Sequence, residues 1–135
     1  MFRKPLLLAV GLALLMQAGI GLGAPHVSAQ TPSVQVTICY VFSDGSRYVG
    51  KPATVWGVVN ERATPLYTAN TNSRGCFVVK VVPNNTYAFT GYYRPSTQTD
   101  CAWTQSGQRG WFYIRPGGPW ALASVPMTRK MECSA

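Results

Sequence analysis

Histidine and acidic side chains are the scarcest reactive groups in this chain of 135 residues. Its one histidine, His26, lies near the N-terminus, and Asp and Glu together number four. A Ser–His or Cys–His mechanism needs an imidazole to carry the proton, and a two-carboxylate hydrolase needs paired acids. The acids here are scattered over turns, loops and the C-terminal tail: Asp44, Glu61, Asp100 and Glu132. With no P-loop or dinucleotide fingerprint either, the sequence predicts a protein that is not an enzyme and carries no cofactor.

Signatures of metal and nucleic-acid binding are also missing. The chain has no Cys-x-x-Cys pair and no cluster of carboxylates, so neither a zinc nor a calcium site is expected. Twelve Lys and Arg outnumber the four acids, but beyond residue 29 the only adjacent basic pair is Arg129–Lys130. Proteins that bind nucleic acids concentrate basic side chains on one face or along one helix. The scattered Lys and Arg side chains of this chain instead indicate a soluble surface, or adhesion to an anionic envelope, polysaccharide or membrane surface.

The first 29 residues have the order of a secretory signal. Residues 1–4 are basic, residues 6–16 (LLLAVGLALLM) are uniformly apolar, and residues 27–29 (Val-Ser-Ala) suit a signal peptidase. Cleavage after Ala29 would leave one domain, residues 30–135, with ten basic and four acidic side chains and a net charge of +6. The alternative is an uncleaved anchor over residues 5–24, whose strongly apolar part is short for a bilayer. We expect a monomer, secreted or at the cell surface, extracellular or periplasmic, with no membrane span after cleavage.

The four cysteines all lie beyond that segment: Cys39, Cys76, Cys101 and Cys133. An even number in an exported chain predicts two disulfides, for which three connectivities are possible. Cys39 is out of phase with the apolar alternation of residues 34–42, and Cys76 with that of residues 76–82. Both side chains are therefore expected to point away from the main core, and the pairing stays open.

Alternating apolar residues mark a series of short strands separated by turn signals. The clearest strand is 34–42, and the others are expected at 53–60, 65–71, 76–82, 86–93, within 108–115, and at 120–128. Residues 94–108 show no period and are expected to form an ordered loop tied down by Cys101. Beyond residue 29 no helical period is long enough to predict a helix. Seven short strands favour a seven-stranded antiparallel Ig-like or prealbumin-like sandwich, with an open barrel as the alternative.

Three turn-and-strand motifs carry a resemblance to a known family. They are GKPATV at 50–55, TNSRGCF at 71–77 and VPNNTY at 82–87. Together they resemble the carboxypeptidase regulatory-like domain, a prealbumin-like sandwich related to the collagen-adhesin B-type repeats. Asn85 stands where the family pattern has Gly, and the four cysteines are additions to it. The resemblance implies a non-catalytic accessory, adhesive or carbohydrate-associated module, and it transfers no active-site residue.

Aromatic and arginine side chains crowd the second half of the chain, where a binding surface is the working hypothesis. The candidate residues are Tyr92, Tyr93, Arg94, Trp103, Arg109, Trp111 and Tyr113. Aromatic faces beside arginines can stack on sugar rings or grip a partner protein. The favoured function is a binding or structural module, with a cell-envelope polysaccharide or a surface protein as partner. A carbohydrate-binding module that uses Trp103, Trp111 and Tyr113 is the second interpretation, and a small secreted enzyme or inhibitor is the third.

Overall fold

The computed structural model describes residues 31–95 and 100–133, and within these ranges every regular element is a β-strand. The eight strands are β1 (Val34–Phe42), β2 (Pro52–Val59), β3 (Arg62–Asn70), β4 (Cys76–Val81), β5 (Asn85–Tyr93), β6 (Cys101–Ile114), β7 (Trp120–Ala121) and β8 (Val125–Cys133). They belong to one compact unit that begins at Ser33. The expected signal segment and its cleavage point lie outside the described residues. No helix in the described ranges is long and apolar enough to cross a membrane.

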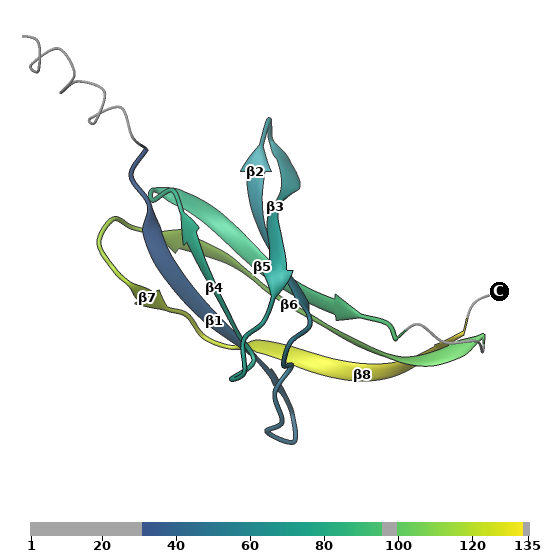
Figure 1. Ribbon diagram of the computed structural model, residues 1–135. Helices are drawn as coiled ribbons and strands as arrows, with labels where there is room; N and C mark the ends of the chain where they lie inside the picture. The colour runs from purple at the N-terminus through teal and green to yellow at the C-terminus, as the bar shows by residue number, and fades with distance from the viewer. Residues whose placement is uncertain (1–30, 96–99, 134–135) are drawn as a thin grey trace, which may run out of the picture. The chain divides into compact units, whose positions relative to one another are not determined.

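The strands form one mixed sheet in the order β3-β2-β5-β6-β8-β1-β4, with β7 paired to β1 (Figure 1). The pairs β1–β7 and β1–β8 are parallel, and the remaining pairs are antiparallel. The end strands approach each other again, because Tyr67 of β3 stacks on Phe77 of β4 with 6.2 Å between ring centroids. An all-β fold is confirmed. The expected seven-stranded antiparallel sandwich is corrected to an eight-stranded mixed sheet that curls nearly into a barrel, closer to the alternative.

Three local departures explain the difference from the expected strands. The β2–β3 connection is a two-residue turn at Asn60 and Glu61, both with positive φ (52° and 63°), as tight hairpins require. Pro65 therefore lies inside β3 and does not begin it. The predicted strand at 120–128 is two strands, which pair with successive parts of β1. The predicted loop at 94–108 is largely β6, whose first half pairs with both β5 and β8.

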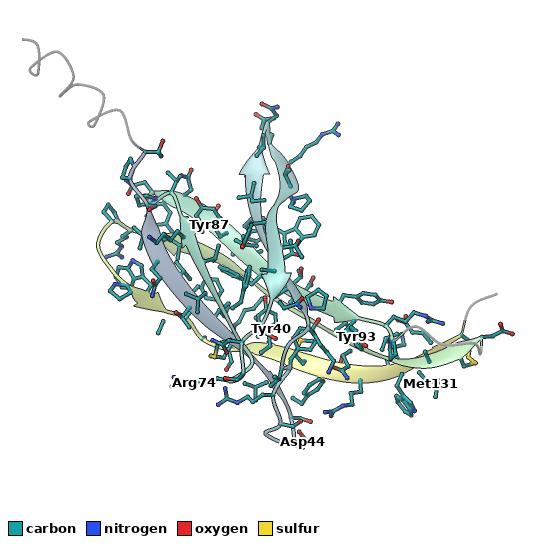
Figure 2. The ribbon with its side chains drawn as sticks, in the orientation of Figure 1. Tyr40, Asp44, Arg74, Tyr87, Tyr93 and Met131 are labelled. Atoms are coloured by element: carbon teal, nitrogen blue, oxygen red, sulfur yellow. A yellow bond between two sulfur atoms is a disulfide. The ribbon has the colours of Figure 1, made fainter. Side chains whose placement is uncertain are left out.

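The core comes from one face of six strands, β1, β2, β4, β5, β6 and β8. The expected inward residues of β1 are all buried: Val34, Val36, Ile38, Tyr40 and Phe42. They pack with buried side chains from five other strands and from the segment after β1, among them Val55, Phe77, Val79, Tyr87, Phe89, Ile114, Val125 and Tyr48. Tyr40 lies among these packed side chains, whereas Asp44 marks the tip of the loop after β1 (Figure 2). Alternation in β1 thus predicts its buried face correctly.

The two disulfides join residues that stand opposite each other on neighbouring strands. Cys39 of β1 bonds to Cys76 of β4, and Cys101 of β6 bonds to Cys133 of β8. The prediction of two disulfides is confirmed, and the structure supplies the connectivity. Neither cysteine belongs to the hydrophobic core cluster, but Cys76 is buried whereas Cys39 is half-buried. Each bridge therefore locks the register of a strand pair.

Candidate functional site

The outward faces of β2, β5 and β6, together with Ala63 of β3, form a cleft of about 500 Å3. Its described lining is made of two tryptophans, small residues and hydrogen-bonding side chains: Trp56, Ala63, Ala88, Thr90, Gln108, Arg109, Gly110 and Trp111. Trp56 pairs with Ala88 in the β2–β5 ladder. The two indoles stand on strands that flank β5, so their backbones are roughly 10 Å apart. Ala88, whose side chain is a single methyl group, lies between the two tryptophans.

Trp56 is held in place by its own polar atom. Its indole Nε1–H donates a hydrogen bond of 2.8 Å to the Thr90 hydroxyl on the neighbouring strand. Ala53, Val55 and Gly57 of the same strand are buried, and Trp56, one position out of phase, points to the other face. The ring position is therefore set before any ligand arrives, which reduces the ordering cost of binding.

A bulge in β6 places Trp111 on this face. The β5–β6 register shifts between Tyr87 and Phe89, so that Gly110 and Trp111 both stand opposite Ala88. Such a bulge re-aims side chains at sheet surfaces. Gly110 also allows the strands to approach closely, because a Cβ at this position would lie 2.5 Å from the Ala88 Cβ. A side chain at residue 110 would push β6 away from β5 and open the cleft.

The rim of the cleft is polar and cationic. Arg109 donates from Nη1 to the Ser124 carbonyl at 2.7 Å, which fixes the guanidinium at the edge of the cleft. Gln108 and Thr90 add a carboxamide and a hydroxyl. No carboxylate is among the described residues that line the cleft. The arrangement offers flat apolar surfaces with hydrogen-bonding groups around them, which suits binding of a neutral or anionic polar ring.

The candidate binding residues fall into two separate groups. Arg109 and Trp111 line the cleft, and Tyr113 follows on the same face, where its hydroxyl bonds Asn84 Oδ1 at 3.2 Å. Trp103 lies eight residues before Trp111 on β6, roughly 25 Å away along an extended strand, opposite Met131 of β8. Both tryptophans are exposed, by 59% for Trp103 and 47% for Trp111. The three aromatics proposed as one sugar platform therefore do not meet.

The other candidates gather at the end of the β6–β8 pair that carries the second disulfide. Tyr92 donates to Glu132 Oε1 at 3.2 Å, and Arg94 Nη1 lies 3.9 Å from the same oxygen. Arg94 also donates to the Glu132 and Asp100 carbonyls, at 3.4 and 3.3 Å. Tyr93 lies under the Lys51 ammonium, 5.1 Å from the ring centroid. Tyr92 and Arg94 thus both bind Glu132 at the ends of the strands, whereas Tyr93 contacts Lys51.

Among the described residues, no group of three or more His, Cys, Asp or Glu could hold a metal ion. The Asp44 carboxylate accepts hydrogen bonds from the Ser46 hydroxyl at 2.6 Å and the Ser46 amide at 2.8 Å. These bonds, with Arg129 nearby, hold the pKa of Asp44 below its usual value. Glu61 lies in the β2–β3 turn. Asp44 thus acts as a turn brace, in keeping with its place in the sequence.

Sequence reasoning missed Trp56, Ala88, Thr90 and Gln108 as members of a site. The outward direction of Trp56 was readable, since it alternates with the apolar Val55. The bulge that brings Trp111 opposite Ala88 has no clear mark in the sequence, because it depends on how β5 and β6 pair.

No family model, no curated protein and no solved structure is significantly similar to this chain. The resemblance to carboxypeptidase regulatory-like domains therefore rests on the three motifs alone, and the structure supports only the coarser statement of an all-β fold.

Proposed function

We propose that this protein is an exported, non-catalytic binding module whose working surface is the cleft between Trp56 and Trp111. The observation that carries the proposal is the pair of indoles on either side of Ala88, one of them oriented by the Thr90 hydroxyl. Half-exposed tryptophans on a sheet face contribute little to the core, whereas they supply large binding energies when a ligand covers them. Disulfides persist mainly in oxidising compartments, which supports export.

A saccharide of a cell envelope is the ligand class that this chemistry favours. A sugar ring has an apolar C–H face, which matches an indole face, and a rim of hydroxyls, which matches Thr90, Gln108 and Arg109. The cleft volume of about 500 Å3 lies within the range of small-ligand sites. The arginine on the rim and the excess of base favour an anionic sugar over a neutral one. Without a carboxylate in the described lining, the cleft has no acid–base pair for glycoside hydrolysis.

A glycan array that includes acidic and neutral envelope polysaccharides tests this proposal, with wild-type protein beside two tryptophan variants. We expect Trp111→Ala to weaken binding about 30-fold, the loss typical of a central aromatic contact. Trp103→Ala is the matched control, because Trp103 is an exposed tryptophan on the same strand outside the cleft. Circular dichroism checks that both variants fold.

Two results would count against the proposal. If the wild-type protein retained no polysaccharide, the proposal that its ligand is a saccharide would be wrong. Release of a reducing sugar from a retained polysaccharide would contradict the non-catalytic part and favour the enzyme interpretation.

A further inference from the structure

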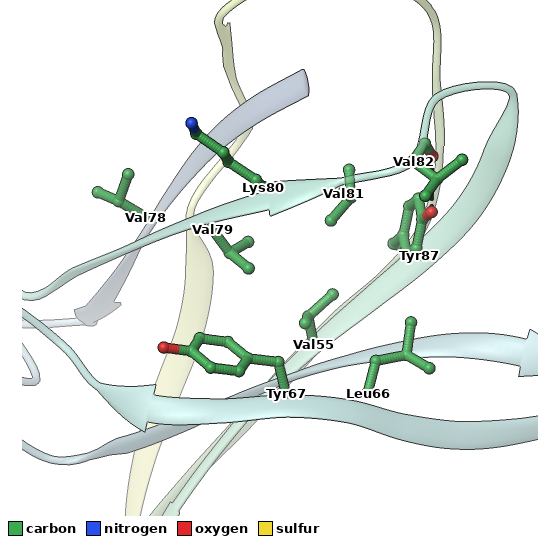
Figure 3. A pocket seen from close by; sticks show the side chains of 9 residues that line it. All are labelled: Val55, Leu66, Tyr67, Val78, Val79, Lys80, Val81, Val82 and Tyr87. Carbon is green, nitrogen blue, oxygen red and sulfur yellow. Dashed lines mark hydrogen bonds between the residues drawn. The ribbon is translucent and has the colours of Figure 1, made fainter. Parts of the chain in front are cut away.

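A second, apolar cleft of about 470 Å3 lies where the curled sheet fails to close. Its walls come from the two end strands and from the core between them: Val55, Leu66, Tyr67, Val78, Val79, Lys80, Val81, Val82 and Tyr87. In Figure 3, Val79 and Val81 point from β4 towards Val55, Leu66 and Tyr67. The Tyr67–Phe77 stack marks where β3 and β4 come together. Buried core and half-exposed surface residues thus form one continuous apolar wall.

The β4 edge of this cleft presents unpaired backbone groups. In the described residues β4 pairs with β1 alone. The Cys76 amide donates to Asn72 Oδ1 at 3.0 Å and its carbonyl accepts from the Asn72 amide at 2.9 Å, so both point away from β1. In an antiparallel ladder this direction alternates. Val78 and Lys80 therefore also direct their N–H and C=O groups to the open edge, as a pairing strand requires.

The β3 wall is less suited to pairing. β3 pairs only with β2 in the described residues, and its register shifts at Leu66, next to Pro65. Proline has no amide hydrogen to donate, and both proline and bulges protect sheet edges from added strands. An incoming strand would thus bond to β4 and rest its side chains against β3.

The charge at the β4 edge determines which kind of partner strand would be attracted to it. Lys80 is the only charged residue among the described lining of the cleft, and it is exposed. Cross-strand neighbours on one face lie close enough for opposite charges to attract and like charges to repel. The described chain has ten basic and four acidic residues, so a second copy would be repelled. A partner strand that carries a carboxylate would be attracted.

We propose that the β4 edge accepts an extended segment of a partner protein, with alternate apolar side chains in the cleft and a carboxylate opposite Lys80. The strand would bond to the backbone of Val78 and Lys80, as peptides do when they extend a sheet. This surface is separate from the Trp56–Trp111 cleft, and neither proposal depends on the other.

The test uses the full-length chain and the synthetic peptide Val-Thr-Val-Glu-Val-Thr-Val between Gly-Ser spacers. Binding is followed by the backbone amide shifts of residues 78–82. With Glu opposite Lys80, the Glu and Thr amides face β4 and the Val amides face away. We expect N-methylation of the Glu and Thr amides to weaken binding at least about tenfold, through loss of several hydrogen bonds. N-methylation of the Val amides should leave it within about twofold, because those amides make no bond to β4.

A charge exchange tests the role of Lys80. Lys80→Glu should weaken the glutamate peptide about fivefold and strengthen a lysine peptide similarly. Lys130→Glu, an equal charge change on β8, is the control and should alter neither. Trp111→Ala should leave peptide binding unchanged, so failure of the saccharide proposal is distinguishable. The proposal would be overturned if millimolar peptide moved no backbone amide shift at residues 78–82, or if both methylation patterns weakened peptide binding equally. It would also be overturned if two copies of this chain formed a dimer that Lys80→Glu abolished.

Discussion

Removal of the Cys39–Cys76 disulfide is the perturbation whose cost the structure defines most directly. The double substitution Cys39→Ala/Cys76→Ala deletes a bridge between directly opposite residues of β1 and β4. These strands carry much of the core, including Ile38, Phe77 and Val79. The bridge closes a sequence separation of 37 residues. In the chain-entropy account, its loss lowers the free energy of unfolding by about 4 kcal/mol, a large part of the stability of a domain this size.

The Cys101–Cys133 disulfide closes a similar separation, 32 residues, so loop entropy alone predicts nearly the same loss. Its surroundings differ, because Cys101 and Cys133 are exposed at the end of the β6–β8 pair and outside the core cluster. We expect Cys101→Ala/Cys133→Ala to release the strand ends locally, since local opening needs less free energy where few apolar contacts hold the chain. Its global loss should therefore be smaller than that of the first pair.

Urea unfolding of both double variants, with hydrogen exchange on the folded proteins, separates these effects. The first variant should lose about 4 kcal/mol and keep its exchange pattern. The second should lose protection at residues 101–105 and 129–133. A loss of less than about 1 kcal/mol on removal of Cys39–Cys76, or a uniform loss of protection in the second variant, would contradict these predictions.

Two further predictions concern buried hydroxyls. Thr71→Val keeps the side-chain shape but removes a buried hydroxyl that donates to the Tyr48 carbonyl at 2.6 Å and accepts from the Lys51 amide at 3.2 Å. We expect it to cost about 1–3 kcal/mol in urea unfolding, against less than about 0.5 for the exposed control Thr68→Val. Burial raises the pKa of Tyr48 to about 12. The pKa of Tyr40 is also raised, mainly by burial and to a smaller extent by the nearby Tyr48. The two buried, neutral phenols contribute fully to folding stability below about pH 10, the pKa of a tyrosine in the unfolded chain. This contribution is lost as the pH rises through their pKa values in the folded protein. Phenolate absorbance during an alkaline titration should show these two rings ionising last, together with unfolding. Ionisation of all seven tyrosines in one step near pH 10, with the fold intact, would contradict this.

Strong alternation made part of the fold predictable. Residues 34–42 alternate strictly, and β1 has those bounds. The turn from Asn72 to Gly75 was readable because glycine tolerates positive φ, and Gly75 has φ of 75°. The Asn60–Glu61 turn was not, since neither residue is the glycine that usually marks a two-residue hairpin.

Long-range pairing decided what the sequence could not show. The first half of β6 shows no alternation of polar and apolar residues, and only its pairing with β5 and β8 makes it a strand. The parallel pairing of β1 with β8 likewise has no local signal. The candidate site depends on the same pairing, because the bulge opposite Ala88 brings Trp111 across from Trp56 while Trp103 stays at the other end of β6. Local pattern thus predicts faces of strands, and register decides which faces meet.

The central claim, that the Trp56–Trp111 cleft is the working surface, is tested most directly by one comparison. Trp111→Ala and Trp103→Ala are titrated against the polysaccharide that the wild-type protein retains best. We expect Trp111→Ala to lose affinity about 30-fold, whereas Trp103→Ala should change it no more than about twofold because Trp103 lies outside the cleft. Equal losses from the two substitutions, or a loss from Trp103→Ala alone, would contradict it.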